Sequence, residues 1–596
     1  MNRRELLEFA GLSAVALAVS EEVWAQAKSG LQPGGAAFNQ VGYLTRGQKL
    51  ASVLVRDPAD LAFSVQSVRT GKTVFQGTLG APMLDASSGD RLAPADFSAL
   101  TTPGEYRLAV QGKRSETFLV GKDVYRLALR TVTRAFYGQR CGCAVDLGGG
   151  YSHPACHSVG AYHASSGRQG AIDNHGGWHD AGDYGRYAVN SGIATGTLLW
   201  AWELYPEVLK GLSLGIPESG GKLPDYLAEI RWNLEWMLQL QDDDGGVWHK
   251  QTSEQFCGFI MPEKDSLTSY VIGTGSAPYK STCATADFAA VMSIAARCYG
   301  PYEDGFAARC LAAARKAWTW TQAHPDVLFE NPPGVSTGGY GDAHCHDEML
   351  WASAELWRTT GDAEYEQAFL VEAEELTPER SIAVPGWGSL APMAYWTYLM
   401  ADRNGSRLAA SGLAGKAGVK PEEIKARIRK QTAMAAEVLV GRRELSGYGH
   451  TLAIVDFGWG SNGVAANQSL LLLVAHRFEA NPAAKQGLLE AALGNLHYLL
   501  GRNCFGVSWV TQVGTNPFQK PHHRPSAADG IAAPWPGLLS GGPNATPADT
   551  VARSLPPGAP MRMWVDDERA YSINEIAINW NAPLVFLLAG ANALAG

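Results

Sequence analysis

Two aspartates, Asp180 and Asp183, lie three residues apart in the glycine-rich stretch GGWHDAGDYG at 176–185. Glycines allow backbone conformations that let neighbouring side chains project into a cleft. A carboxylate of ordinary pKa can deprotonate a water molecule that a second carboxylate orients, so the pair predicts general-base chemistry. A structural interpretation is equally good for the pair alone, because Asp side chains also cap helices such as the one expected near Tyr187.

A second acidic motif lies near the C-terminus, where WVDDE at 564–568 is followed by Tyr571 and by NEIAINWNA at 574–582. Glu575 opens an apolar segment that we expect to be helical. Partial desolvation at such an edge raises the pKa of a carboxyl group and keeps it protonated as an acid. For Glu575 alone, a simpler interpretation is stronger: a Glu in a first helical turn favours the helix dipole.

A third motif, SWVTQVGTN at 508–516, is followed by His522 and Arg524. An imidazole and a guanidinium side by side can donate hydrogen bonds to sugar hydroxyls. The alternative is a polar loop that bonds to its own backbone.

Four residues, Cys141, Cys156, His157 and His179, form a candidate structural zinc site, since thiolates and imidazoles together suit tetrahedral zinc. Cys143 could replace Cys141, and the alternative is buried thiols beside a hydrogen-bonded histidine. Such a zinc would hold His179 in place without performing chemistry. The chain has nine cysteines, an odd number that does not indicate a disulfide framework in a large exported protein.

The elements that must position these motifs are about twelve segments with an apolar repeat of 3.6 residues. They begin near residues 124, 187, 225, 283, 305, 345, 363, 386, 421, 465, 484 and 574. No strand pattern alternates with them, which argues against a parallel α/β sheet. Twelve helices fit a closed double ring of six hairpins; a solenoid is the alternative, weakened by the lack of a short repeat. Long glycine-rich loops at 139–182, 242–282 and 501–573 carry the motifs, as functional loops do.

Residues 36–121 are expected to be β, because short alternating runs at 51–55 and 105–110 lie between turn signals. Several strands in about 85 residues predict a small immunoglobulin-like sandwich. This segment contains no tryptophan, so we expect it to brace the larger domain at 124–596 rather than to bind sugar.

The N-terminus and the composition indicate location and partners. Residues 1–27, with Arg3 and Arg4 before an apolar run, predict an export signal, of twin-arginine rather than ordinary type, and hence a periplasmic or secreted protein. A formal charge of −9 without a basic run argues against binding to nucleic acid or a membrane surface. No later stretch is long and apolar enough to span a bilayer. We expect a monomer.

Taken together, three patterns resemble glycoside hydrolase family 9, the inverting cellulases: Asp-Ala-Gly-Asp at 180–183, the run 508–524 ending in His-x-Arg, and the run 564–582. The resemblance extends from about residue 36 to the end. It implies a mainly α fold, an (α/α)6 barrel preceded by an immunoglobulin-like β-sandwich, of which NQVGY at 39–43 resembles the start.

By position, the resemblance implies that Asp183 is the general base, that Asp180 helps it on the same water, and that Glu575 is the general acid. Asp566 would support the acid or bind near the cleavage point. His522 and Arg524 would hold hydroxyls of the glycan. The family-like stretch FGWGSN at 457–462 places Trp459 as a sugar-stacking residue, with a core role nearly as good, and Tyr571 is a further substrate-binding candidate.

The implied activity is endo-acting hydrolysis of β-1,4-glucosidic bonds in cellulose or related β-glucans. The alternatives are an exo-acting β-glucosidase, cellobiohydrolase or glucosaminidase on the same fold, and a non-catalytic glycan-binding protein. Relatives that hold zinc beside the base turn support the zinc site. Calcium is a weaker expectation: a stretch with Ser219, Gly220, Asp225 and Glu229 resembles a calcium-binding one, but Ala228 replaces an acidic residue. A second candidate is the acidic run 242–244, for which a solvated loop is the better interpretation.

Overall fold

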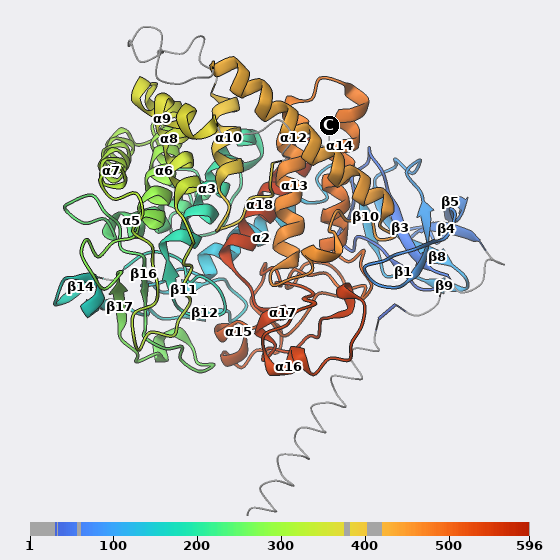
Figure 1. Cartoon of the computed structure of the whole chain (residues 1–596). Coiled ribbons are helices and arrows are strands. Elements are labelled where there is room, and N and C mark those ends of the chain that lie inside the picture. Colours follow the sequence, from blue (N-terminus) through green and yellow to red (C-terminus); the bar gives the residue numbers. More distant parts are fainter. Residues whose placement is uncertain are drawn as a thin grey trace, which may run out of the picture.

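The computed structural model describes residues 30–31, 34–55, 61–173, 175–374, 382–401 and 420–594. The export signal expected at 1–27 lies outside these residues. The described chain forms a β-sandwich packed against one side of a larger helical unit (Figure 1). Within it, no helix has the length and apolar character needed to cross a membrane.

The N-terminal unit contains two sheets. One has the strand order β1 (Ala36–Ala37), β3 (Leu50–Leu54), β7 (Arg91–Asp96), β6 (Met83–Leu84), and the other β2 (Gly42–Tyr43), β10 (Phe118–Val120), β8 (Gly104–Val110), β4 (Ala62–Ser67), β5 (Thr73–Thr78), with β9 (Lys113–Arg114) paired to β8. Val53, Val65 and Leu108 belong to its core and are at most 1% exposed. The expected sandwich is confirmed.

Twelve helices build the larger unit as a double ring. The inner ring contains α3 (Ala188–Leu204), α6 (Thr282–Tyr299), α8 (His346–Thr360), α10 (Ala391–Met400), α13 (Ser461–Phe478) and α18 (Ile578–Ala593). The outer ring contains α2 (Arg126–Gly138), α5 (Asp225–Gln239), α7 (Asp304–Ala323), α9 (Ala363–Ala373), α12 (Pro421–Leu445) and α14 (Pro482–Leu499). Helices α3, α6, α8 and α10 contact one another in turn, α18 contacts both α3 and α13, and the outer helix α12 contacts both α10 and α13. Each predicted helical segment matches one of these helices, so the (α/α)6 prediction is confirmed.

Burial explains which helices lie inside. Helix α3 is buried from Ala188 to Trp202, and its glycines admit the neighbouring helices: a Cβ on Gly196 would lie 2.5 Å from the Trp351 ring. Helix α12 instead buries one face, with Ile424 and Ile428, and exposes charged residues on the other. A helix that is buried on every side lies in the interior, and an amphipathic helix covers it.

The six hairpins make the two ends of the barrel unequal. Connections from inner to outer helices are often short, such as 300–303, 361–362 and 479–481, whereas α4 (Pro206–Leu209) lies in a longer one. Connections from outer to inner helices are long and gather at one end (Figure 1). We predicted three of these as functional loops and missed those at 324–345, 382–390 and 446–460.

The long connections contain small elements of their own. A mixed sheet has the order β14 (Ala171–Asp173), β13 (Val159–Tyr162), β17 (Ser269–Ile272), β16 (Lys250–Thr252), β15 (Arg186–Tyr187), and β11 (Val145–Asp146) pairs with β12 (Ser152–His153). Short helices follow: η1 (Ala164–Ser166), η2 (Pro262–Lys264), η3 (Ile454–Asp456), α15 (Arg524–Ala528), α16 (Thr550–Arg553), η4 (Pro560–Arg562) and α17 (Tyr571–Asn574). The sequence pattern did not predict this sheet, because its strands are two to four residues long.

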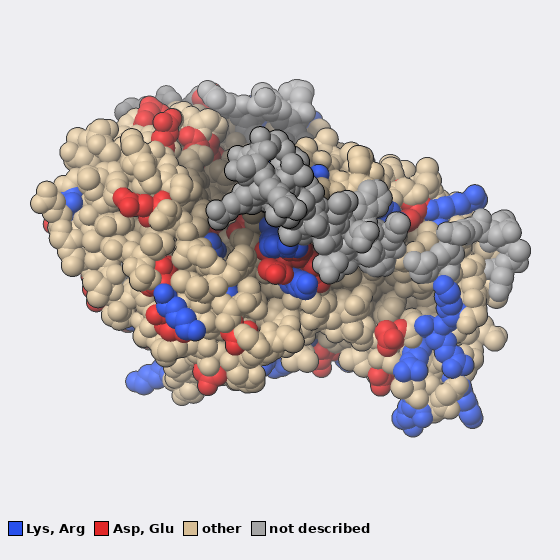
Figure 2. Space-filling model, turned by 90° about the horizontal axis from the view of Figure 1, so that it is seen from below, with Lys and Arg blue, Asp and Glu red and all other residues tan. Residues whose placement is uncertain are grey.

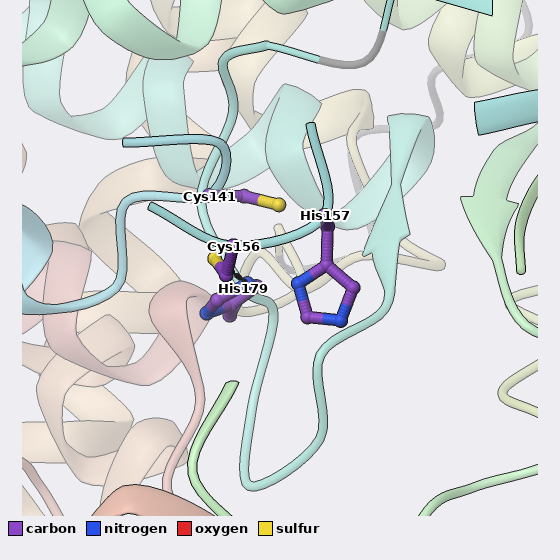
Figure 3. A group of neighbouring side chains, drawn as sticks. All are labelled: Cys141, Cys156, His157 and His179. Carbon is purple, nitrogen blue, oxygen red and sulfur yellow. Dashed lines mark hydrogen bonds between the residues drawn. The ribbon is translucent and has the colours of Figure 1, made fainter. Parts of the chain in front are cut away.

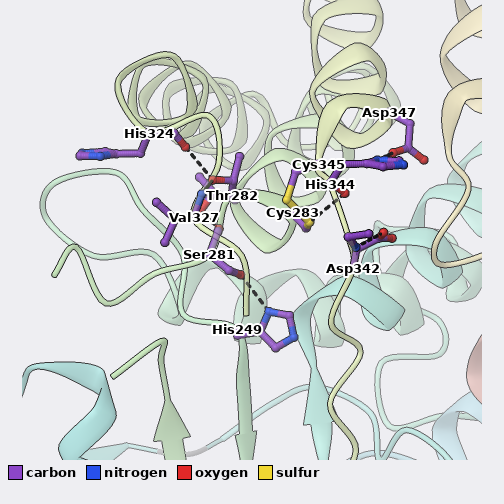
Figure 4. The surroundings of a disulfide bond; sticks show 12 residues. His249, Ser281, Thr282, Cys283, His324, Val327, Asp342, His344, Cys345 and Asp347 are labelled. Carbon is purple, nitrogen blue, oxygen red and sulfur yellow. Dashed lines mark hydrogen bonds and ion pairs between the residues drawn. A yellow bond between two sulfur atoms is a disulfide. The ribbon is translucent and has the colours of Figure 1, made fainter. Parts of the chain in front are cut away.

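One disulfide, between Cys283 and Cys345, joins the first turn of α6 to the start of α8 (Figure 4). The other seven cysteines are free. The odd number of cysteines did not predict this single disulfide.

Candidate active site

Backbone hydrogen bonds join three distant segments at the loop-bearing end of the barrel. The Ile578 N–H donates to the Asp180 carbonyl at 2.9 Å, and the Arg524 N–H donates to the Gly182 carbonyl at 3.2 Å. The His522 N–H donates to the Asn574 carbonyl at 2.9 Å. The Asp-Ala-Gly-Asp turn, the His-x-Arg pair and the Glu575 segment are therefore neighbours.

These segments line a cleft of about 870 Å³. All six outer-to-inner connections contribute to it: its lining includes Asp180, Asp183, Tyr187, Phe256, Tyr340, Trp387, Trp459, His522, Arg524, Tyr571, Glu575 and Trp580. On the face that carries these loops, acidic and basic side chains gather near the centre among mostly uncharged atoms (Figure 2). A cleft with acids at its floor and aromatic rings on its walls suits a neutral, ring-shaped ligand.

The Asp183 carboxylate is held from one side. Its Oδ2 accepts hydrogen bonds from the Gly185 N–H at 2.9 Å and from the Tyr187 hydroxyl at 3.0 Å. A side chain at Gly185 would collide with it, since a Cβ there would lie 2.6 Å from Oδ2. Helix α3 begins after the N-cap residue Tyr187, and no side chain caps its first turn. The helix-capping interpretation of the aspartate pair is therefore wrong.

Asp180 lies deeper, with both oxygens occupied. Oδ1 accepts from the Asn190 amide and Oδ2 from the Tyr340 hydroxyl, each at 2.6 Å. Burial, followed by the nearby charge of Asp183, raises the pKa of Asp180 to about 7, and the two hydrogen bonds oppose this rise. Near neutral pH, Asp180 is therefore only partly ionised.

Glu575 is not in the first turn of α18, as the sequence suggested, but in the extended segment after α17. Its φ of −64° and ψ of 155° follow from pairing, since its carbonyl accepts from the Gly541 N–H at 2.7 Å. Burial, then the charges of Asp183 and Asp180, raises the pKa of Glu575 well above its usual range. Arg524 and the Gly182 N–H, which donates to the carboxylate, oppose the rise. The side chain is partly exposed in the cleft, as a proton donor must be.

Asp566 lies behind the cleft and does not line it. Its two oxygens accept from the Gln519 and Lys520 N–H groups, each at 2.7 Å. These bonds fix the turn that leads to His522. The geometry therefore favours support of the site over contact with a bound ligand.

His522 and Arg524 both reach the cleft, but neighbouring carbonyls hold them. The His522 imidazole contacts the Glu568 carbonyl at 2.6 Å through Nδ1. Arg524 donates to the Gly182 carbonyl at 2.6 Å through Nη1, and to the Cys257 carbonyl through Nε and Nη2. Arg524 therefore joins the loop around Cys257 to the turn at 180–183 by hydrogen bonds, a role that the sequence did not predict.

Aromatic residues form the walls. Trp459 is 50% exposed and lies 5.5 Å from the Tyr571 ring, so the stacking interpretation of Trp459 agrees better with its position than a core role. Sequence reasoning missed Tyr340 and Trp387, whose rings are 5.3 Å apart. Both lie between glycines, in GGYG at 338–341 and GWG at 386–388, and an aromatic residue between glycines was the available signal.

The four residues of the expected zinc site come together (Figure 3). One ligand atom from each of Cys141, Cys156, His157 and His179 lies within 4.8 Å of the others, and Cys143 is not part of the group. The buried Nδ1 of His157 has no hydrogen-bond partner, while its Nε2 lies 3.3 Å from Asp265. A histidine that ligates through one nitrogen and contacts a carboxylate through the other is typical of zinc sites, so the residues fit this metal.

The candidate calcium stretches have protein partners instead. Arg140 forms ion pairs with Glu229 and Glu218, each at 2.9 Å, and Asp225 accepts from the Ser219 hydroxyl at 2.5 Å. In the acidic run 242–244, Asp242 and Asp244 pair with Lys280. Calcium stays a prediction that this geometry does not favour.

Comparison with known proteins completes the description of the site. The model of glycosyl hydrolase family 9 matches residues 125–588, and that of the cellulase N-terminal immunoglobulin-like domain matches residues 36–115. Endoglucanase D of Acetivibrio thermocellus is 35% identical over 560 residues, which cover 93% of this chain and 82% of the relative. A xyloglucan-specific endo-β-1,4-glucanase of Bacteroides ovatus is 34% identical, with 94% of each chain covered.

A solved structure agrees with the sequence comparison. It is described as a zinc-binding triple mutant of the family 9 endoglucanase J30, and it is 35% identical to this chain with a TM-score of 0.82. The match covers 92% of this chain and 99% of the other. The sequence motifs, the barrel, the acidic cleft and these matches agree. The chain belongs to glycosyl hydrolase family 9.

Proposed function

We propose that this protein hydrolyses β-1,4-glucosidic bonds of cellulose or a related β-glucan with inversion at the anomeric carbon. The observation that carries the proposal is the meeting of Asp183 and Glu575 in one cleft, with Gly182 joining their two segments. In this family the acid and the base flank the scissile bond, roughly 6.5–9.5 Å apart in inverting enzymes.

The proposed mechanism follows from the different surroundings of the carboxyl groups. Glu575, whose pKa is raised by burial and by the nearby aspartates, keeps its proton at neutral pH and gives it to the leaving oxygen. Asp183 accepts hydrogen bonds from the Gly185 N–H and the Tyr187 hydroxyl, and it takes a proton from the attacking water. Asp180 accepts a hydrogen bond from the same water and orients it for attack.

The walls of the cleft support a polymer of neutral sugars as substrate. Trp459, Trp387 and Tyr571 offer flat apolar faces that suit the faces of glucose rings. The endoglucanase names of the relatives support internal cleavage of a β-1,4-glucan chain, and the xyloglucanase name supports tolerance of a decorated chain. Hence we infer endo action on cellulose or a related glucan.

We also propose that Cys141, Cys156, His157 and His179 hold zinc. Bound there, the metal would supply structure rather than catalysis, because all four ligands come from the protein. His179 precedes Asp180 in the chain, so the site would fix the start of the base turn.

For the location we propose export to the periplasm or the medium as a monomer. The residue pattern of 1–27 supports export. The Cys283–Cys345 disulfide is consistent with it, since such bonds persist in oxidising compartments.

A product analysis tests the proposed function. The enzyme is incubated with carboxymethylcellulose and with short β-1,4-oligosaccharides, and the first anomer released is followed by NMR. We expect a fast loss of viscosity and α-anomeric products. A β-anomer as first product would refute inversion, and release of small sugars without viscosity loss would refute endo action.

A further inference from the structure

Lys250 is a buried cation directly behind the proposed base. It lies on β16 opposite Tyr187 of β15, and it has no solvent exposure. Its ammonium group lies 5.7 Å from the centre of the Tyr187 ring, the same ring whose hydroxyl contacts Asp183. Among the described Asp and Glu residues, none forms an ion pair with it.

The ammonium group holds the loop between α7 and α8 through oxygen acceptors. Lys250 Nζ donates to the Asn331 side chain and to the Gly338 carbonyl, each at 2.7 Å, and to Thr337 Oγ1 at 3.1 Å. The preceding residue, His249, contacts the Gly339 carbonyl at 2.8 Å through Nε2. This strand therefore fixes the loop immediately before Tyr340.

That loop reaches both catalytic aspartates. The Gly338 N–H donates to the Tyr187 hydroxyl at 3.2 Å, and this hydroxyl donates to Asp183. Two residues further on, the Tyr340 hydroxyl donates to Asp180. A displacement of residues 337–338 would therefore move the hydrogen-bond donors of both carboxylates.

We propose that Lys250 is a positioning residue for the hydrolytic reaction: its buried charge stabilises ionised Asp183, and its hydrogen bonds hold the loop that orients Tyr187 and Tyr340. The inference rests on the proposed role of Asp183 as base. A salt bridge would satisfy the ammonium group and remove its field, whereas neutral carbonyl partners leave the positive charge available to the nearest carboxylate.

Other titratable groups also surround Asp183 and Lys250. Those that face Asp183 or Lys250 are Asp180, Glu575, Arg524, His522 and His249. Burial lowers the pKa of His249 to about 3, so this histidine is neutral and supplies no charge. Burial also lowers the pKa of Lys250 to about 7, against the charge of Asp183, so its ammonium group is charged on the acidic limb of the pH profile, below pH 7.

Two other buried lysines show what a purely structural lysine looks like here. Lys49, in the sandwich, donates to the carbonyls of Thr45, Gly47 and Ser98 at 3.1–3.2 Å and lies far from the cleft. Lys280 is neutralised by Asp242 at 2.6 Å. Lys49 is therefore a matched control, because its burial and its carbonyl partners resemble those of Lys250 without a catalytic neighbour.

The test uses Lys250→Met, which removes both the charge and the donors, and Lys250→Gln, which removes the charge and keeps two donors. The pH dependence of kcat/KM on a soluble cello-oligosaccharide is compared with that of the wild type and of Lys49→Met. We expect the acidic limb of both Lys250 variants to move to higher pH by about 0.5 to 1 unit, because Asp183 protonates more easily without the nearby cation. We also expect kcat to fall more than KM changes, and Lys49→Met to lower Tm with the pH profile unchanged.

The outcomes separate this inference from the proposed function. If both Lys250 variants are less stable but retain the wild-type pH profile, Lys250 is only structural and the inference fails. If Lys250→Met does not fold, the Gln variant alone decides. If Asp183→Asn retains full hydrolysis, the proposed base is wrong, whatever the lysine variants do.

Discussion

Replacement of Glu575 by glutamine is the sharpest test of the proposed mechanism. Glutamine has the same shape and can still accept the hydrogen bond from the Gly182 N–H, but it has no proton to give. Loss of general-acid catalysis costs about 10²- to 10⁴-fold in rate. We therefore expect kcat on cello-oligosaccharides to fall by about that factor, with little change in KM.

The nature of the leaving group distinguishes an acid from a merely structural residue. A 2,4-dinitrophenyl β-cellobioside releases a stable phenolate that needs no protonation, so its hydrolysis should lose far less activity than that of cellotetraose. The assay compares the two substrates with wild-type and Glu575→Gln enzyme. Equal losses on both would refute the assignment, because they would mean that Glu575 acts by positioning alone.

The pH dependence of the free energy of unfolding tests the raised pKa of Glu575 independently, with the same variant. Since the folded-state pKa of Glu575 lies above its unfolded value, ionisation destabilises the folded state as pH rises above the unfolded pKa. Each unit of upward shift costs about 1.4 kcal/mol once the pH exceeds the folded pKa. Glu575→Gln should therefore have nearly wild-type stability at pH 4 and be more stable at neutral pH, as measured by urea unfolding. A variant less stable at neutral pH would contradict the raised pKa.

Three further predictions follow from the site and its supports. Tyr340→Phe removes the hydrogen bond to Asp180, and a bond to a charged group is worth about 1.5–3 kcal/mol, so kcat/KM should fall about 10- to 100-fold; unchanged kinetics would exclude the role. Purified protein should contain one zinc per chain by elemental analysis, and Cys156→Ser should lose the metal and lower Tm, whereas metal-free wild type of equal Tm would contradict the site. The Cys283–Cys345 crosslink closes a separation of 62 residues, so the double Ala variant should lose at most about 4 kcal/mol of unfolding free energy, and identical urea midpoints would show that the bond contributes nothing.

Local periodicity in the sequence was enough to predict the helices. The apolar repeat that begins near residue 225 corresponds to α5, and that near 421 corresponds to α12, because each pattern reflects one face packed on the inner ring. The start expected near 574 is four residues early. Glu575 and Ile576 pair with backbone at His522 and Ser540, and these long-range bridges keep the chain extended until Ile578. The local apolar repeat of a sequence does not predict such long-range backbone pairing.

Motifs identified the acids but not their partners. Asp180 and Asp183 stand in a recognisable turn, yet their hydrogen-bond donors include Tyr340, which is 160 residues from Asp180 and lies in a loop with no acidic motif. Lys250 was missed for the same reason, since a single lysine in a short strand carries no pattern. Contacts of this kind become visible only when the ring of helices brings the loops together at one end.

The N-terminal sandwich belongs to the same argument, because its contacts reach the acidic segment indirectly. Gln40 accepts from the Asn516 N–H at 2.7 Å and donates to the Gly506 carbonyl at 2.8 Å, and the Ser87 carbonyl accepts from the Met561 N–H at 2.8 Å. All three contacts are on the connection between α14 and α18, which also carries Asp566 and Glu575.

This connection runs for almost eighty residues with only short helices of its own, so its shape depends on what it packs against. The sandwich fixes the two stretches on either side of the His-x-Arg pair, and Asp566 then joins them through Gln519 and Lys520. The hydrogen bonds from the sandwich therefore add to the local bonds that hold this connection. These contacts agree with the bracing role expected for the sandwich, because they hold the connection that carries Glu575, the proposed general acid.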